Sequence, residues 1–319
     1  MIITVTLNAA LDVTYRVPSL RPHSTHRVTH TAERPGGKGL NVARVLAALG
    51  RPAVVTGFVG GPVGAELRER LAERAAEYDD GLLTDALVPI AGTTRRTVGV
   101  VDDTTGDTTM FNEPGPTVTP REWGGFLERY RALLADGRAT AVALCGSLPP
   151  GLPVGAYAEL VREARAAGVF VLLDTSGEPL RRGLAARPDL IKPNAVELTG
   201  LTGFSEPARA AGDARRRGAR AVAASLGEDG MLALTEEGGW QALPPARLAG
   251  NPTGAGDSAV AGLLSGLAEG LTWPRRLARA VALSAATVAA PAAGEFDAAV
   301  YAELLPQVTV VPAEPGAAV

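Results

Sequence analysis

The stretch Asn251-Pro252-Thr253-Gly254-Ala255-Gly256-Asp257-Ser258 joins a glycine-rich turn to a carboxylate at the point where a helix is expected to begin. Glycines 254 and 256 let the backbone approach a ligand closely because they carry no Cβ. The small residues from Ser258 onward predict a helix, and the free amides at a helix N-terminus bind anions. Because an aspartate repels a bound anion, we expect Asp257 to have a chemical role, which is to take a proton from the nucleophile that attacks the anion.

Two other interpretations compete for this stretch. Gly254-x-Gly256-x-x-Ala259 formally matches the dinucleotide fingerprint of oxidoreductases. That fingerprint requires a preceding apolar strand and an acid about 20 residues later, whereas here prolines precede it and arginines stand near that distance. A plain turn at a helix start is the simpler alternative. The P-loop sequence Gly-x4-Gly-Lys-Ser/Thr does not occur in the chain.

A second glycine-rich loop opens another predicted helix and carries a cation. Gly36-Gly37-Lys38-Gly39-Leu40-Asn41 leads into residues 42–49, whose apolar spacing predicts a helix that stops at Gly50. Of the 31 lysines and arginines only Lys38 and Lys192 are lysine. A compact, mobile ammonium suits a phosphate that is held rather than transferred.

Composition and charge exclude several classes of protein. The 319 residues are 46% hydrophobic and 20% charged, and a net charge of -3 is not typical of a nucleic-acid-binding protein. The single Cys145 rules out an internal disulfide and is expected in the core. In an extended segment His26 and His30 would stand about 13 Å apart, so with His23 they predict exposed residues rather than a metal site.

No targeting or membrane segment is apparent in the sequence. The N-terminal residues lack a basic region, and no window reaches the ~18 consecutive apolar residues that a membrane helix requires. We therefore expect a cytoplasmic protein with no membrane contact.

Strands and helices alternate from residue 53 onward, which predicts an α/β fold with a mostly parallel central sheet flanked by helices. Short β-branched segments at about 12–33 and 94–112 predict a small second sheet inserted as a lid. We expect one domain over residues 1–319, with a disordered tail at 313–319.

Polar residues stand at the ends of several predicted strands. Asp174 closes one of them, where α/β sheets place ligand contacts. Asn194 and Glu197 would share one face of a helix start and suit Mg²⁺ or its waters, but a capping box is the favoured interpretation of that pair alone. Ser225-Leu-Gly227-Glu-Asp-Gly230 predicts, by itself, only a strand followed by a turn.

Taken together, these motifs resemble the ribokinase-like sugar kinases of the phosphofructokinase B type over essentially the whole chain. The two glycine-rich stretches correspond to that family's two signatures. Four further motifs are most similar to its 1-phosphofructokinase and tagatose-6-phosphate kinase branch: Thr-Leu-Asn8 with Asp12, Gly146-Ser-Leu-Pro-Pro150, Asp174-Thr-Ser-Gly177 and Ile191-Lys-Pro-Asn194. The resemblance implies a three-layer ribokinase-like fold and a homodimer formed through the β-lid.

The resemblance also implies a role for each matching residue. Asp257 corresponds to the catalytic base, with an anion hole formed by the amides of Gly254, Ala255 and Gly256. The sugar hydroxyls would be held by Asp12, Gly37 and Asn41. The phosphate already on the sugar would be held by Lys38 and Arg95, with Ser147 as a further contact. ATP and Mg²⁺ would be held by Lys192, Asn194, Glu197, Ser225, Gly227 and Gly230, with Asn194 and Glu197 reaching the metal through water.

The expected activity is ATP-dependent phosphorylation of a primary hydroxyl on a phosphorylated ketohexose, with fructose-1-phosphate as the leading substrate. Two features depart from the branch: Asn8-Ala9-Ala10 stands where Asn-Pro is usual, and Met110 stands where some phosphofructokinases carry a second phosphate-binding arginine. Tagatose-6-phosphate kinase and 6-phosphofructokinase are the alternative activities. A kinase of an unphosphorylated sugar or nucleoside, or a non-catalytic regulator that binds the same ligands, is more remote.

Overall fold

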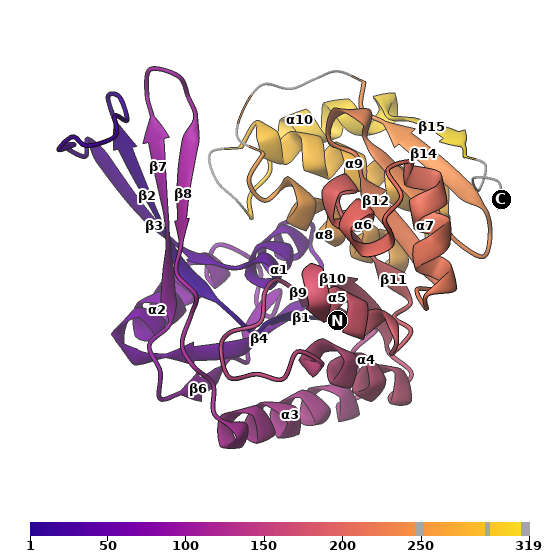
Figure 1. The fold of residues 1–319 in the computed structure, drawn as a ribbon, viewed down its shortest axis with the longest axis horizontal. Coiled ribbons are helices and arrows are strands. Elements are labelled where there is room, and N and C mark those ends of the chain that lie inside the picture. The colour runs from indigo at the N-terminus through magenta and orange to yellow at the C-terminus, as the bar shows by residue number, and fades with distance from the viewer. Residues whose placement is uncertain (246–249, 251, 291–293, 314–319) are drawn as a thin grey trace.

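The computed structural model describes residues 1–245, 250, 252–290 and 294–313, and it is built around one large sheet (Figure 1). The sheet has the strand order β15-β14-β13-β12-β11-β10-β9-β1-β4-β5, with β6 also paired to β4. Pairing is parallel from β5 to β12 and antiparallel from β12 to β15, which confirms the predicted mostly parallel sheet. The strands are β1 Ile2–Thr6, β4 Ala53–Gly60, β5 Leu83–Asp85, β6 Val88–Ile90, β9 Ala141–Cys145, β10 Phe170–Asp174, β11 Leu190–Ile191, β12 Ala221–Ser225, β13 Met231–Leu234, β14 Gly239–Leu243 and β15 Thr309–Pro312.

Helices cover both faces of this sheet and make a three-layer architecture. One face carries α3 Pro120–Ala135, α4 Ala156–Ala166, α5 Gly177–Leu184, α6 Ala195–Thr202 and α7 Pro207–Arg216. The other carries α1 Lys38–Ala48, α2 Gly61–Ala75, α8 Ala255–Ala268, α9 Trp273–Val288 and α10 Ala298–Leu304. Two short 3₁₀ turns, Gly227–Asp229 and Leu305–Gln307, complete the helical elements of the described residues.

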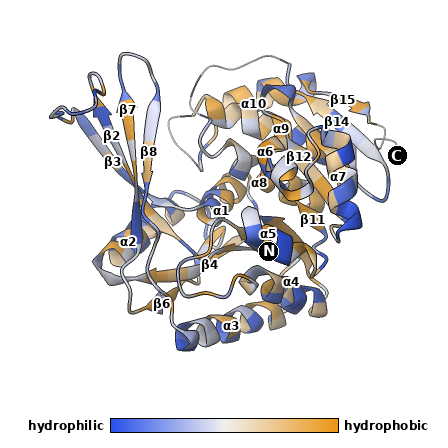
Figure 2. Ribbon diagram, in the orientation of Figure 1, coloured by the Kyte–Doolittle hydropathy of each residue, from blue (hydrophilic) through white to orange (hydrophobic). Residues whose placement is uncertain are grey.

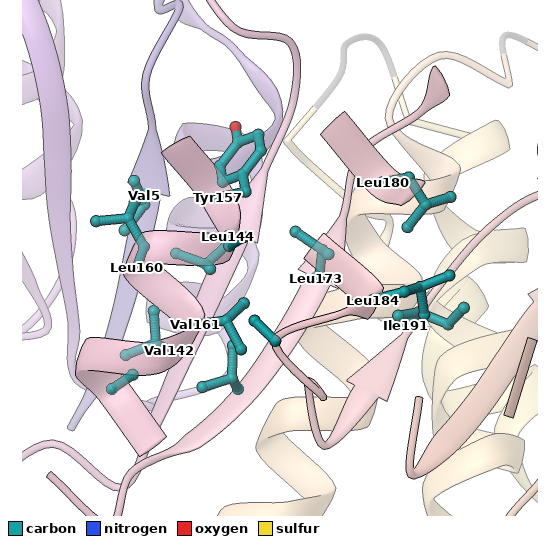
Figure 3. Close-up of a cluster of buried hydrophobic side chains, with 14 of the residues drawn as sticks. Val5, Val142, Leu144, Tyr157, Leu160, Val161, Leu173, Leu180, Leu184 and Ile191 are labelled. Atoms are coloured by element: carbon teal, nitrogen blue, oxygen red, sulfur yellow. The ribbon is translucent and has the colours of Figure 1, made fainter. Parts of the chain in front are cut away.

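Because successive side chains of a strand point to opposite faces, each central strand feeds two separate cores. Val142 and Leu144 of β9 belong to the core under α3 to α7, whereas Ala141, Ala143 and Cys145 belong to the core under α1, α8 and α9. Figure 3 shows strand residues of the first core packed against α4 and α5. Full burial of each large aliphatic side chain stabilises the fold by about 1.5 to 3 kcal/mol. In Figure 2 the helices show hydrophilic residues on their outer sides.

A second sheet of four strands stands away from the main body at the upper left of Figure 1. Its order is β3-β2-β7-β8, formed by β2 Ala10–Val17, β3 His30–Gly36, β7 Arg95–Asp102 and β8 Thr108–Asn112. Leu11 and Val13 of β2 pack on Val63 of α2, which anchors the base of this sheet to the main body. The predicted small second sheet is therefore confirmed, while its action as a lid stays a prediction.

The structure differs from the sequence-based expectations in two places. Helix α1 begins at Lys38 and not after Asn41, because Gly37 adopts a φ of 112° as N-cap and its carbonyl accepts the Asn41 amide at 3.0 Å. Strand β15 was not among the predicted elements: its β-branched residues suit a strand, but its pairing partner β14 lies far away in the sequence. The expected disordered tail at 313–319 lies outside the described residues except for Ala313.

None of the helices in the described part of the chain is long and apolar enough to cross a bilayer.

Candidate active site

The carboxyl ends of the parallel strands bring several polar residues to one edge of the sheet, some of them predicted as site residues. Asn8 follows β1, Ser147 follows β9, Asp174 ends β10, and Lys192 follows β11. Because parallel strands all end at the same edge, residues far apart in the sequence become neighbours there. Helices α1 and α8 lie against each other and add the two glycine-rich motifs to this edge.

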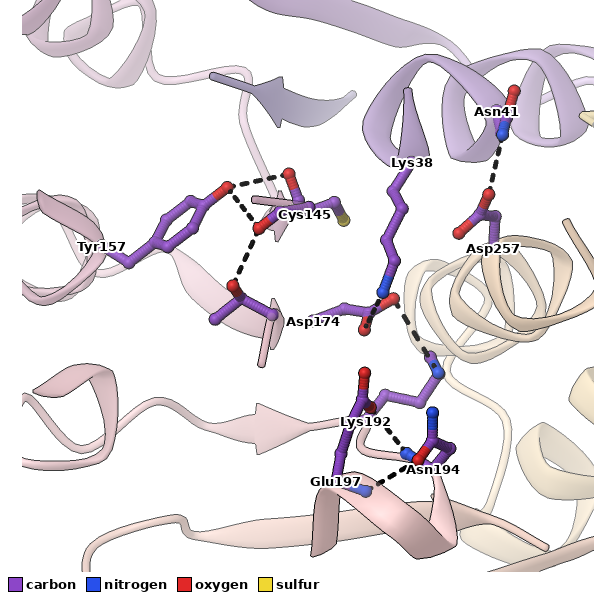
Figure 4. Close-up of polar contacts among 11 residues, drawn as sticks. Lys38, Asn41, Cys145, Tyr157, Asp174, Lys192, Asn194, Glu197 and Asp257 are labelled. Carbon is purple, nitrogen blue, oxygen red and sulfur yellow. Dashed lines mark hydrogen bonds and ion pairs between the residues drawn. The ribbon is translucent and has the colours of Figure 1, made fainter. Parts of the chain in front are cut away.

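Asp257 lies in the first turn of α8 and is buried. Its Oδ2 accepts a hydrogen bond of 2.8 Å from Nδ2 of Asn41, so the two glycine-rich motifs contact each other directly (Figure 4). Burial and the nearby charge of Asp174 raise the pKa of Asp257, whereas the Asn41 bond and two lysines lower it. The net result is a pKa of about 6, which suits a general base near neutral pH.

The start of α8 has the backbone of an anion site. Gly254 is its N-cap with a φ of 87°, a conformation that favours glycine. A Cβ at Gly256 would lie 3.4 Å from Nζ of Lys192, so this ammonium lies beside the positive end of the helix dipole. The amide of Ala255 already donates to the Pro252 carbonyl at 3.1 Å, so of the three predicted anion-hole amides this one is engaged in a turn.

Both lysines of the chain contact the same buried carboxylate. Nζ of Lys38 lies 3.1 Å from Oδ1 of Asp174, and Nζ of Lys192 lies 3.8 Å from Oδ2 (Figure 4). The Lys38 side chain is 40% exposed, whereas Lys192 and Asp174 are almost fully buried. Burial works against the charge of Lys38, but neighbouring carboxylates, led by Asp174, raise its pKa above the usual value. Asp174 thus holds the two cations together at the centre of the site.

Asp12 lies where β2 passes the glycine-rich stretch at residues 36–41. A Cβ at Gly36 would lie only 2.1 Å from Cγ of Asp12, so glycine is needed for the carboxyl to lie there. Burial raises the pKa of Asp12 to about 6, and the charges of Arg44 and Arg95 limit that rise. Asp12 is therefore a second carboxyl that titrates close to neutral pH.

Asn8 connects Arg95 with Ser147, the other two residues expected near the sugar phosphate. Nδ2 of Asn8 donates to Oγ of Ser147 at 3.1 Å, and the backbone carbonyl of Asn8 accepts from Nε of Arg95 at 3.2 Å. Nη1 of Arg95 also donates to the carbonyl of Glu113, the residue that follows the second sheet. These bonds bring the base of the second sheet to the edge of the main sheet.

The residues expected to bind nucleotide form a chain of local contacts. Asn194 and Glu197 make a complete capping box: Oδ1 of Asn194 accepts the Glu197 amide at 2.8 Å, and Oε2 of Glu197 accepts the Asn194 amide at 2.9 Å (Figure 4). The capping interpretation is confirmed, and a role in metal binding stays a prediction. Asn194 also forms a parallel bridge with Ser225. Positive φ values of 65° and 78° at Gly227 and Gly230 shape the turn that follows.

Three residues of the site were not predicted from the sequence as site residues. Asp174 was placed at a strand end but not between the lysines, although the scarcity of lysine was the available signal. Asn8 was quoted only as part of a motif. Arg44 gave one signal, an arginine three residues after Asn41 within an apolar helix, and the structure buries it next to that asparagine.

The histidines and the cysteine have the positions that the sequence predicts. His23 and His30 are exposed and His26 is partly exposed, and within the described residues no group of three His, Cys, Asp or Glu side chains could hold a metal. Cys145 is fully buried, and burial raises the pKa of its thiol well above the usual value. Neither residue type takes part in the site.

Known proteins resemble this chain over nearly its full length. The model of the pfkB family carbohydrate kinases matches residues 4–298. A 1-phosphofructokinase of Rhodobacter capsulatus is 39% identical over 291 residues, which are 89% of this chain and 90% of that protein. Phosphofructokinase-2 of Escherichia coli in complex with fructose-6-phosphate is 28% identical with a TM-score of 0.85, over 96% of this chain and 98% of that one. Ribokinase of Arabidopsis thaliana shares the fold with a TM-score of 0.73 at 23% identity, over 95% and 98% of the two chains.

Proposed function

Because the chain belongs to the pfkB family of carbohydrate kinases, we propose that it phosphorylates fructose-1-phosphate with ATP and releases fructose-1,6-bisphosphate and ADP. The observation that carries the proposal is the bond between Asn41 and Asp257. It joins a candidate base in the first turn of α8 to the first turn of α1, which contains Lys38. A site built from the starts of α8 and α1 can hold the phosphate that is transferred next to the phosphorylated sugar that accepts it.

Asp257 is the proposed base of the phosphoryl transfer. It takes the proton from a primary hydroxyl of the sugar as the hydroxyl oxygen bonds to the γ-phosphorus of ATP. The bond between that phosphorus and the bridging oxygen breaks, and its electron pair leaves with ADP. Such transfers need little covalent help from the protein, so positioning and charge stabilisation dominate.

The first turn of α8 and Lys192 are the proposed stabilisers of the transferred group. Backbone amides and the helix dipole are fixed in place before the reaction, and each well-placed donor contributes about 3 kcal/mol to the transition state. Lys192 adds a full positive charge beside Gly256. Asp174 balances this charge when no phosphate is present.

Magnesium is the proposed metal partner of ATP. Mg²⁺ usually takes one or two protein carboxylates, several waters and substrate phosphates. Glu197 fits this pattern because it is a partly exposed carboxylate whose charge reaches Lys38 in the centre of the site. Asn194 would contact the hydrated ion through water, and the ion would neutralise charge on the nucleotide phosphates.

The sugar phosphate has a separate set of proposed contacts. Lys38 and Arg95 provide the positive charges, with Ser147 as a neutral donor, while Asp12, Gly37 and Asn41 hold the sugar hydroxyls. Met110, on β8, provides no second phosphate-binding arginine, which favours a phosphate at C1 over one at C6.

A substrate screen tests this assignment directly. ATP consumption should be measured with fructose-1-phosphate, fructose-6-phosphate, tagatose-6-phosphate, fructose and ribose at equal concentration. We expect the highest kcat/KM for fructose-1-phosphate. A higher kcat/KM for another phosphorylated ketohexose would change the assigned substrate but keep the chain among the sugar-phosphate kinases. No ATP consumption with any of the five sugars would overturn the proposed function.

Acidic pH is expected to inactivate the enzyme in two protonation steps. Asp257 and Asp12 both have pKa values of about 6 and both act as ionised acceptors. Log kcat/KM for the sugar phosphate should therefore fall below about pH 6 with a slope between one and two. In Asp12→Asn the limiting slope of log kcat/KM against pH should be smaller by one than in the native chain. Ionisation of the substrate phosphate affects the native chain and the variant equally, so it does not contribute to this difference. An unchanged kcat/KM down to pH 5 would contradict the assigned roles.

We also propose that two copies of the chain pair through the second sheet. Phe111 is 58% exposed on the edge strand β8, and its neighbour Met110 is exposed as well, as is Val28 just ahead of β3 at the opposite edge of the sheet. Figure 2 colours much of β7 as hydrophobic in this projecting sheet. Light scattering after size-exclusion chromatography should give a dimer for the native chain and a monomer for Phe111→Glu. A monomeric native chain at micromolar concentration would exclude this assembly.

A further inference from the structure

Arg44 is the largest of the fully buried side chains in the described part of the chain, with 2% exposure. It lies on α1 three residues after Asn41, so both side chains occupy the same face of the helix. Buried charged groups are normally paired because their desolvation is unfavourable. The position of this cation behind the active site therefore indicates a specific role.

Two hydrogen bonds connect Arg44 to the candidate base. Nη2 of Arg44 donates to Oδ1 of Asn41 at 2.9 Å, and Nδ2 of Asn41 donates to Oδ2 of Asp257 at 2.8 Å. A guanidinium group has donors only, so the oxygen of the Asn41 amide must face Arg44. The NH₂ end must then face Asp257. Chemistry, and not shape, fixes the direction of this chain of bonds.

We propose that Arg44 is a positioning residue that locks the Asn41 amide and thereby reserves Oδ1 of Asp257 as the oxygen that takes the substrate proton. Oδ2 is occupied as an acceptor, and the other oxygen points away from Asn41 (Figure 4). The inference rests on the proposed role of Asp257 as base. It adds which oxygen of the carboxylate reacts and what holds it in place.

When Arg44 no longer holds the Asn41 amide in place, protonation of Asp257 becomes more favourable. Without a donor-only neighbour, the Asn41 amide can rotate and present its oxygen to Asp257, where two acceptors repel each other and protonation relieves the repulsion. The other charged groups around Asp257 are Lys38 of α1, Asp174 of β10 and Lys192 after β11. Around Arg44 the charged or titratable groups are Asp12, Glu295, Tyr78 and Arg74. A substitution at Arg44 leaves the three groups around Asp257 in place.

Arg44→Gln and Arg44→Lys form the matched pair of variants. Glutamine keeps much of the volume but can accept as well as donate, whereas lysine keeps a charged, donor-only group. We expect Arg44→Gln to move the acid limb of kcat upward by about one pH unit, the size of shift that loss of a charge-assisted bond gives. Arg44→Lys should restore most of the native profile. The measurement is kcat between pH 5 and 8.5 at saturating ATP and sugar phosphate.

The Asn41→Ala background tests whether the effect passes through the amide. In that background Arg44→Gln should cause no further shift of the acid limb of kcat, because the Asn41 amide that connects Arg44 to Asp257 is already absent. An unmoved limb in folded Arg44→Gln, or an additional shift in the Asn41→Ala background, overturns the proposal. Activity that survives in Asp257→Asn would instead overturn the proposed base, so the two failures can be distinguished.

A measurement on the native chain keeps the proposal testable if Arg44→Gln does not fold. Asn41 is one of five asparagines, and its side-chain NH₂ can be observed by NMR after ¹⁵N-asparagine labelling and assigned by its loss in Asn41→Ala. We expect its signals to titrate near pH 6 in the native chain and to stay constant in Asp257→Asn. A native Asn41 amide that does not sense this titration overturns the proposed lock.

Discussion

Asp257→Asn is expected to lower kcat by about 10²- to 10⁴-fold, the contribution that general acid–base catalysis makes in enzymes. Asparagine keeps the shape of the side chain and can still accept the bond from Asn41, but it cannot take a proton. Calorimetric titration should therefore show near-native affinity for ATP and for the sugar phosphate. A kcat within a few-fold of the native value would exclude Asp257 as the base.

The same substitution is expected to stabilise the fold, which separates lost chemistry from unfolding. The pKa of Asp257 is raised from 3.8 to about 6, so the folded state disfavours its charge at neutral pH by up to about 3 kcal/mol. This penalty is present above the folded pKa and disappears as the pH falls towards 3.8. Thermal unfolding should therefore show a higher Tm for Asp257→Asn at pH 7 and a smaller difference at pH 4.5.

Asp12→Asn is the matched control for this experiment. Asp12 is a second carboxyl with a pKa raised to about 6 by burial, but its proposed role is to hold the sugar. Its loss should raise KM for the sugar phosphate more than it lowers kcat. Equal effects of the two substitutions on kcat would show that a raised carboxyl pKa alone does not identify the base.

The architecture could be predicted because its signals are local. Alternating strands and helices, together with glycines at 37 and 254 ahead of helices, predicted the layers and the two glycine turns that cap α1 and α8. The central contacts of the site were not predictable in the same way. Asn41 and Asp257 are 216 residues apart, and Lys38 and Asp174 are 136 apart, so only the tertiary fold brings each pair together. Arg44 was hidden for a related reason, since an arginine on a helix is exposed far more often than buried.

Asn194 and Glu197 show that one pattern can serve two purposes. Their spacing predicted both a capping box and a pair of oxygen ligands, and the structure contains the capping box. A capping box still leaves a carboxylate oxygen at the helix start, where the active site lies. Local structure therefore positions Glu197 without excluding its proposed contact with the hydrated metal.

Lys38→Ala is expected to raise KM for the sugar phosphate by at least tenfold and to change KM for ATP by less than threefold. A charge-assisted hydrogen bond contributes about 1.5 to 3 kcal/mol, and 1.4 kcal/mol corresponds to a factor of ten. We expect the lower end of that range because the Lys38 side chain is 40% exposed and solvent weakens its interactions. Lys192→Ala, which removes the only other lysine, should have the opposite effect and raise KM for ATP more than KM for the sugar phosphate.

Chemical labelling tests the same assignment without a substitution. An amine-reactive reagent can modify only Lys38, Lys192 and the N-terminus. Lys192 is only 4% exposed, so Lys38 should react first of the two lysines, although slowly because its raised pKa keeps it protonated. The sugar phosphate is proposed to bind Lys38 in place of Asp174, so it should protect Lys38 in a peptide mass measurement. Unphosphorylated fructose lacks the group that recruits the lysine and should protect it much less. Equal protection by both sugars, or equal losses for both substrates in Lys38→Ala, would contradict a phosphate-specific role for this lysine.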